Sequence, residues 1–207
     1  RIDFTHFKKK PKWFIGFSDA TVLHSHINNM DIATIHGIMA ASVSGATPQA
    51  IESLHKALFG DKISYTVPAH KYNKPGKVSG ELVGGNLSVL FSIVGSRSEM
   101  DYKGKILFLE DLDEYLYHVD RMMMNLERNG YFKNVKGILI GGFTKMRDND
   151  IPWGHSALEI IKDITKEYNI PICFNFPAGH ITDNRALTFG KEVTLEVTAT
   201  GTKLTFE

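Results

Sequence analysis

Three residues far apart in the chain have the types and contexts that acyl-transfer chemistry uses. Ser18 lies between an apolar run and a helix-like segment, Glu110 directly follows the apolar run ILFL, and His180 lies in a polar loop. A serine that passes its proton to a histidine, itself oriented by a carboxylate, can attack an amide carbonyl. These residues therefore point first to nucleophilic hydrolysis.

The context of Ser18 is that of a nucleophile on a sharp strand-to-helix turn. The small residues Gly16 and Ala20 leave room for the chain to double back. The backbone N–H of Asp19 would then face an attacked carbonyl oxygen near the positive end of a helix. Ala20 replaces the second glycine of the usual G-x-S-x-G motif, so an alternative stays open in which Asp19 caps the helix and Ser18 is a turn residue.

His180 is the best placed of nine histidines. It follows a predicted strand over residues 170–174, at the carboxyl end where ligand sites of α/β proteins gather. A solvated loop histidine is the alternative. The single cysteine, Cys173, lies within the same predicted strand and is expected to be a buried small side chain, so no internal disulfide can form.

Glu110 opens the acidic segment EDLDE. Asp113 is predicted to cap the next helix with Glu114 in its first turn, which leaves Glu110 without a structural role. The spacing does not match a calcium loop, so a metal-dependent hydrolase is the weaker alternative, and neither a metal nor a cofactor is expected.

The segment Gly84-Gly85-Asn86 is predicted to be a turn between a strand and a helix. Free backbone N–H groups at such a junction could receive a carboxylate or an oxyanion of the substrate. The spacing G-x-G-x-x-G is missing, which argues against a dinucleotide site. A tight turn without a ligand is an equal alternative.

Composition narrows the functional classes. The chain has 207 residues, 43% of them hydrophobic, and a formal net charge of +1. Such a chain can bury a sizeable core, and its charge favours neither nucleic acid nor an anionic membrane as a partner. No apolar segment approaches the ~20 residues that cross a bilayer. With one thiol and no secretory signal, a cytoplasmic location is expected.

Alternating strands and helices in the first third predict a parallel, Rossmann-like α/β layer that ends in a strand over residues 63–67. The polar, proline-containing residues 68–78 are predicted to be a linker. Residues 79–207 are expected to form a smaller mixed α/β domain, closed by an antiparallel hairpin around Thr200-Gly201. The fold class is therefore α/β, with a partial N-terminal domain over residues 1–67 that carries Ser18.

Five segments together resemble the LD-carboxypeptidases, serine peptidases that include the self-immunity peptidases against microcin C. The likeness runs over nearly the whole chain, in order and at compatible spacing. The segments are GFSDAT, GELVGGNLSVL, ILFLEDLDEYLYHVDRM, VKGILIGGF and PAGHITDNRALTFG.

The resemblance implies a catalytic triad of Ser18, Glu110 and His180. The implied activity is hydrolysis of the bond between an L-centred diamino acid and the terminal D-alanine of a murein tetrapeptide, during cytoplasmic cell-wall recycling. A small muropeptide substrate and a homodimer are implied as partners. A peptidyl or aminoacyl nucleotide substrate, as in the microcin branch, and a non-catalytic muropeptide-binding module stay open as alternatives.

Family members carry further N-terminal strands and a glycine-rich loop that helps to shape the oxyanion pocket. No counterpart of that region precedes Arg1 in this sequence. We therefore expect the chain to be a fragment with reduced activity, because losing one oxyanion donor typically slows catalysis by ~10²–10³-fold.

Overall fold

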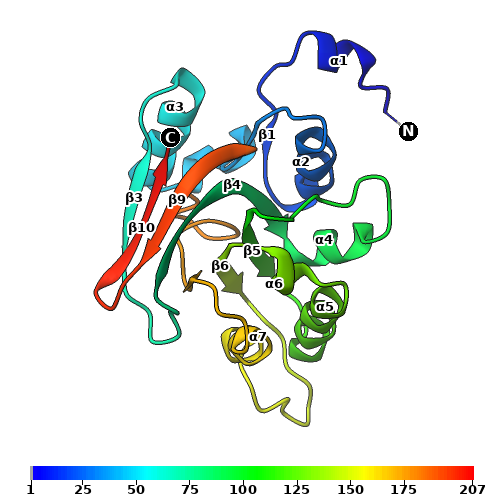
Figure 1. Ribbon diagram of the computed structural model, residues 1–207, viewed down its shortest axis with the longest axis vertical. Coiled ribbons are helices and arrows are strands. Elements are labelled where there is room, and N and C mark those ends of the chain that lie inside the picture. Colours follow the sequence, from blue (N-terminus) through cyan, green and yellow to red (C-terminus); the bar gives the residue numbers. More distant parts are fainter. Residues whose placement is uncertain (1) are drawn as a thin grey trace.

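The computed structural model describes residues 2–207, so Arg1 of the expected first domain lies outside the described residues. Two sheets organise the fold (Figure 1). A three-stranded sheet has the order β1-β2-β8, and a seven-stranded sheet has the order β3-β10-β9-β4-β5-β6-β7. The fold class is the predicted one, a mixed α/β arrangement with parallel central strands and antiparallel edges.

The small sheet leads into the turn at Ser18, the predicted nucleophile. In it β1 pairs with β2 in parallel and β2 pairs with β8 antiparallel. The 3₁₀ helix η1 and helix α2 follow β1 directly. The bounds are β1 Ile15–Gly16, η1 Ser18–Ala20, α2 Thr21–Asn28, β2 Thr34–His36 and β8 Leu187–Phe189.

The large sheet is parallel from β4 to β7 and antiparallel from β4 through β9 and β10 to β3. The predicted hairpin of β9 and β10 is confirmed. The strands are β3 Ser64–Pro68, β4 Gly76–Asn86, β5 Ile106–Leu112, β6 Gly137–Thr144, β7 Ile172–Cys173, β9 Lys191–Val197 and β10 Gly201–Phe206.

Helix α5 packs against both α4 and α7 beside the parallel strands of the large sheet (Figure 1). Their apolar sides and the facing strands form one buried core, in which Met122 and Met123 are fully covered, as the sequence predicted. Helix α2 packs against β4, β2 and α4. The bounds of the other helices are α1 Thr5–Lys9, η2 Ala40–Gly45, α3 Pro48–Phe59, α4 Leu87–Ile93, α5 Leu116–Arg128, α6 Tyr131–Asn134 and α7 Ala157–Thr165.

Local signals placed α3 correctly. The Thr47 hydroxyl accepts a hydrogen bond from the Ala50 N–H at 3.2 Å, Pro48 occupies the first turn, and Gly60 follows in the left-handed conformation with φ 78°. Each residue type suits that position, because a hydroxyl caps free N–H groups and glycine adopts positive φ without strain.

Three local predictions are wrong. Asp113 does not cap α5, which begins at Leu116; Asp113 has φ 63° and binds Arg147 instead. Glu114 precedes the helix and contacts His118. Gly84 and Gly85 do not form a turn but lie within β4. Both have positive φ, and their lack of a side chain lets Phe108 and Thr21 approach the strand closely.

Strand pairing crosses the expected domain boundary in both directions. β3, expected in the N-terminal parallel layer, is an antiparallel edge strand of the large sheet beside β10. β8, from the C-terminal half, joins the small sheet beside β2. The division at residues 67 and 79 stays a prediction. Each of the two sheets contains strands from both sides of it.

Replacing Gly85 with alanine tests the close approach of α2 to β4. A Cβ at Gly85, which has φ 147°, would lie 2.4 Å from the Thr21 hydroxyl oxygen. We expect Gly85→Ala to lower the free energy of unfolding by roughly 1–3 kcal/mol, the usual cost of overpacking. Urea unfolding measures this, with Gly45→Ala as the control because its added Cβ meets no atom within 4 Å. Equal stabilities of the two variants would contradict the tight contact.

Candidate active site

The chain turns sharply at Ser18. Its φ of 62° is the left-handed conformation that side chains rarely adopt, while Phe17 before it is extended. Gly16 allows the turn, because a Cβ there would lie 2.8 Å from the Ala20 methyl group. Backbone strain of this kind is typical of a nucleophile at an elbow. The structure thus gives Ser18 the predicted local geometry, with Ser18 at the start of η1 and Asp19 as its second residue.

His24 supports the turn at Ser18 through contacts of both of its ring nitrogens. Its Nε2 donates to the carbonyl oxygen of Gly16 at 3.0 Å, and its Nδ1 lies 2.7 Å from the Thr34 hydroxyl. Burial lowers the pKa of His24 to about 4, so the ring is neutral and its Nδ1 accepts a hydrogen bond from the Thr34 hydroxyl. The last residue of β1 is thereby fixed from α2 and β2.

Glu110 and His180 form a hydrogen-bonded pair. The Nδ1 of His180 lies 2.7 Å from the Oε2 of Glu110, and the backbone N–H of His180 donates to the same oxygen at 3.1 Å. Glu110 is fully buried, and its Oε1 has no hydrogen-bond partner among residues 2–207. The pair holds the ring with Nδ1–H on the carboxylate, which leaves Nε2 unprotonated and able to act as a base.

Glycines let the His180 loop approach the strands. Positions 141 and 142 of β6 lie opposite a register irregularity in β5 at Glu110. A Cβ at Gly141 would lie 2.5 Å from the Ala178 carbonyl oxygen, and one at Gly179 would lie 2.7 Å from the Glu110 Oε2. Such irregularities redirect side chains next to active sites. Glu110 therefore meets His180 because these positions lack side chains.

Charge and burial act in opposite directions on His180. Burial by itself lowers the pKa of the ring, but the hydrogen bond and negative charge of Glu110, with the charges of Asp111 and Asp19, outweigh it and raise the pKa. Burial also raises the pKa of Asp111 to about 6. A histidine held by a buried carboxylate is the arrangement that a general base requires.

The structure brings Ser18 to the same region as the pair without joining them. The ring of Phe17, next to Ser18, contacts the His180 ring with centroids 4.9 Å apart. No hydrogen bond of the Ser18 hydroxyl is present in the described part of the chain. The hydrogen bond between a catalytic serine and its histidine is often long or poorly aligned before substrate binds.

The predicted substrate contact at residues 84–86 has structural tasks in this state. The backbone N–H of Asn86 donates to the Thr21 hydroxyl at 3.0 Å, and its side-chain amide donates to Asp111 at 2.9 Å. The side-chain oxygen of Asn86 caps α4. Gly84 packs on the backbone of Phe108, and Gly85 packs on the side chain of Thr21. These contacts join the Ser18 elbow to the end of β5.

The acidic segment is divided between separate partners. Asp111 binds Asn86 and the N–H of Ser88, Asp113 binds Arg147, and Glu110 binds His180. Among residues 2–207, no group of three or more histidine, cysteine or acidic side chains is arranged to hold a metal ion. Cys173 is buried as predicted, and burial raises the pKa of its thiol to about 11.

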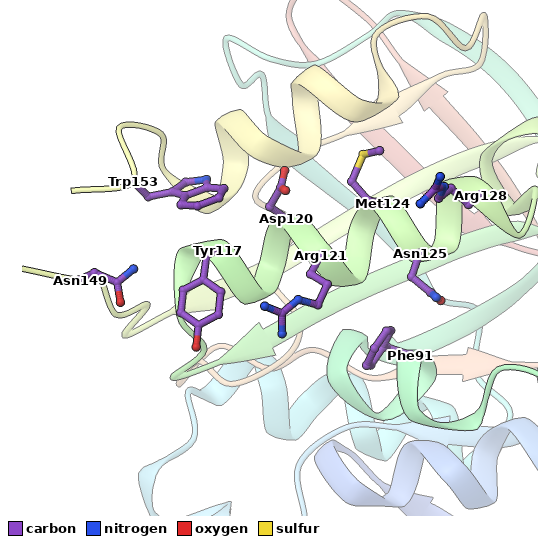
Figure 2. Close-up of a pocket in the computed structure, with 9 residues that line it drawn as sticks. All are labelled: Phe91, Tyr117, Asp120, Arg121, Met124, Asn125, Arg128, Asn149 and Trp153. Carbon is purple, nitrogen blue, oxygen red and sulfur yellow. The ribbon is translucent and has the colours of Figure 1, made fainter. Parts of the chain in front are cut away.

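Two hollows matter for the position of the site. One, of about 540 Å³, is lined by residues that include Phe17, Lys145, His180 and Asn184. The other, of about 680 Å³, lies on the outer side of α5 beside Phe91 and Trp153 (Figure 2). None of the predicted site residues lines the larger hollow, whereas His180 lines the smaller one.

Sequence reasoning missed residues that support the site. The side-chain oxygen of Asn184, which is 1% exposed, accepts from the Gly179 N–H at 2.8 Å. The Thr144 hydroxyl donates to the His180 carbonyl oxygen at 3.1 Å. Asn184 lies four residues after His180, which is the signal that could have found it; the sequence gives no such signal for Thr144.

No helix among residues 2–207 is long and apolar enough to span a membrane.

Replacing Glu110 with glutamine should lower the pKa of His180, because burial remains while the negative charge is lost. NMR titration of the imidazole measures this, and Glu192→Gln, an exposed site on β9, is the control. A histidine whose pKa is raised by folding stabilises the protein fully below its ordinary pKa of ~6.5, and this contribution disappears as pH rises through the raised value. The stability advantage of the wild type over Glu110→Gln should therefore shrink above that value. An unchanged His180 titration would refute the pairing.

Comparisons with known proteins place the chain. The profile of the LD-carboxypeptidase C-terminal domain matches residues 79–195, and that of the N-terminal domain matches residues 1–37. The probable murein peptide carboxypeptidase of Bacillus subtilis (strain 168) is 34% identical over 204 residues, with 94% of this chain and 63% of that protein covered. The chain thus spans under two thirds of that relative's length.

Two solved structures match nearly the whole chain. The crystal structure of muramoyltetrapeptide carboxypeptidase from Oxalobacter formigenes matches with a TM-score of 0.90 and 26% identity, covering 99% of this chain and 71% of that one. The microcin C7 self-immunity protein in complex with aspartyl sulfamoyl adenosine matches with a TM-score of 0.84 and 21% identity, covering 100% and 71%. At that identity the second likeness concerns the fold alone.

Proposed function

Because the chain belongs to the LD-carboxypeptidase family, we propose that it carries the catalytic centre of a serine peptidase that releases D-alanine from murein tetrapeptide. The bond cut is the one between the L-centred diamino acid and the D-alanine. The observation that carries the proposal is the Glu110–His180 hydrogen bond beside the strained Ser18 elbow. The names of the murein peptidases similar to this chain support the choice of substrate.

In the proposed mechanism His180 Nε2 takes the proton of the Ser18 hydroxyl as its oxygen attacks the amide carbonyl. The Asp19 N–H stabilises the resulting oxyanion, and Glu110 stabilises the imidazolium through Nδ1. His180 then gives the proton to the departing amine of D-alanine. Water, deprotonated by the same ring, releases the acyl group from Ser18.

The finer assignments follow the family. We propose a homodimer acting in the cytoplasm, where recycled muropeptides would be its substrates. Substrate contact by Gly84, Gly85 and Asn86 stays a prediction; it would require the Asn86 amide to exchange its bond with Asp111 for one with substrate.

In the full-length protein, Ser18→Ala should reduce D-alanine release from the tetrapeptide L-Ala-γ-D-Glu-meso-diaminopimelate-D-Ala by about 10⁶-fold, the loss typical for a serine nucleophile. Chromatographic or coupled detection of free D-alanine measures it. Ser92→Ala, whose hydroxyl bonds only the local helix backbone, is the matched control. Turnover retained in Ser18→Ala would overturn the assignment of the nucleophile.

The pH dependence of kcat/KM tests the base. His180 must be neutral to take the proton, and Glu110 raises its pKa. Activity should therefore rise with pH through a value above the ordinary ~6.5 of histidine. Glu110→Gln should lower the activity about 10⁴-fold. The acid limb of the remaining activity should lie at a lower pH than in the wild type, because the pKa of His180 is lower. An acid limb at the same pH in both proteins would exclude His180 as the titrating base.

A second candidate is hydrolysis of a peptidyl or aminoacyl nucleotide, which the shared fold with the microcin C7 self-immunity protein suggests. The same triad would serve both reactions. Parallel assays with the tetrapeptide and with an aspartyl-adenylate analogue bearing a scissile amide separate them, since the preferred substrate has the higher kcat/KM. Tight tetrapeptide binding with no turnover of either substrate would indicate a non-catalytic binding module.

A further inference from the structure

The hollow beside His180 is the space next to the group that would protonate the leaving amine in the proposed reaction. His180 and Phe17 line it, whereas Ser18 and Asp19, the proposed nucleophile and oxyanion donor, do not. In acyl transfer the histidine that takes the serine proton passes it to the departing amine. The residue that leaves must therefore lie against His180, and this hollow of about 540 Å³ is the space found there.

The lining of the hollow is suited to a negative charge. No aspartate or glutamate lines it, whereas Lys145 and the hydroxyl residues Ser42, Ser44 and Thr182 do. A carboxypeptidase acts on a terminal residue that bears a free carboxylate, and an ammonium group is a strong hydrogen-bond donor to a carboxylate. We propose that this hollow is the leaving-residue subsite and that Lys145 binds the terminal carboxylate, an inference that rests on the proposed function.

The backbone positions Lys145 for this task. Lys145 follows Thr144, whose hydroxyl donates to the His180 carbonyl oxygen at 3.1 Å, so the lysine begins next to the catalytic loop. Its φ of 52° is a strained conformation for a lysine, of the kind that functional sites retain.

The ammonium group of Lys145 is free to bind a ligand. Lys145 forms no ion pair of 4.0 Å or less with any residue from 2 to 207. The acidic side chain Asp113 is held by Arg147, whose Nε donates to Asp113 Oδ1 at 2.7 Å and whose second nitrogen bonds Oδ2. The hydrogen bond from Arg147, together with the nearby charges of Arg147 and Lys145, lowers the pKa of Asp113, so Asp113 lies near the lysine without forming an ion pair with it.

Binding to the Ser18→Ala variant tests this inference separately from catalysis. Calorimetry gives Kd for the tetrapeptide with a free terminal carboxylate and for the same peptide with a terminal amide. Adding Lys145→Gln should weaken binding of the free acid about 10-fold, as expected for a lost charge-assisted hydrogen bond, and should leave binding of the amide unchanged. Lys145→Arg should keep the preference for the free acid.

The matched control is Lys103→Gln, an exposed lysine that lies outside the hollow. It should leave both Kd values unchanged. An unaltered preference in Lys145→Gln, or equal weakening of both peptides, would overturn the role of Lys145. Failure of the proposed function has a different signature, because wild-type protein would then bind the free acid without releasing D-alanine.

Discussion

The site depends on one contact, the packing of the loop around His180 onto the ends of β5 and β6. One carboxylate oxygen of Glu110 receives both the side-chain Nδ1–H and the backbone N–H of His180. The loop can come this close only because Gly141 and Gly179 have no side chain at the contact. A Cβ at either position would separate the His180 ring from the Glu110 carboxylate that orients it.

Burial makes that contact chemically useful. Glu110 is fully buried, so its charge is poorly screened by water and acts strongly on the neighbouring ring. A buried carboxylate is costly unless it is paired, and His180 supplies the pairing. The same hydrogen bond therefore stabilises the buried charge of Glu110 and supplies the orienting anion that His180 needs in its proposed role as a base.

A second set of contacts places Ser18, the proposed nucleophile, relative to this pair. Thr21, directly after the Ser18 turn, accepts a hydrogen bond from the Asn86 N–H, and the Asn86 side chain binds Asp111 next to Glu110. His24 holds Gly16 from the other side. The small sheet that carries Ser18 is therefore attached to the end of β5 by buried hydrogen bonds, which hold well because water cannot compete for them.

The sequence by itself determined the fold class, the caps of α3, the closing hairpin and the residue types at the site, since these follow from local apolar patterns and turn chemistry. It misplaced the start of α5, because the pairing of Asp113 with Arg147 is a contact between residues 34 positions apart. Only the tertiary structure decided that β3 joins β10, that residues 84 and 85 continue a strand, and that Glu110 meets His180. Each of these depends on how closely segments distant in sequence can approach, and local propensity carries no information about that distance.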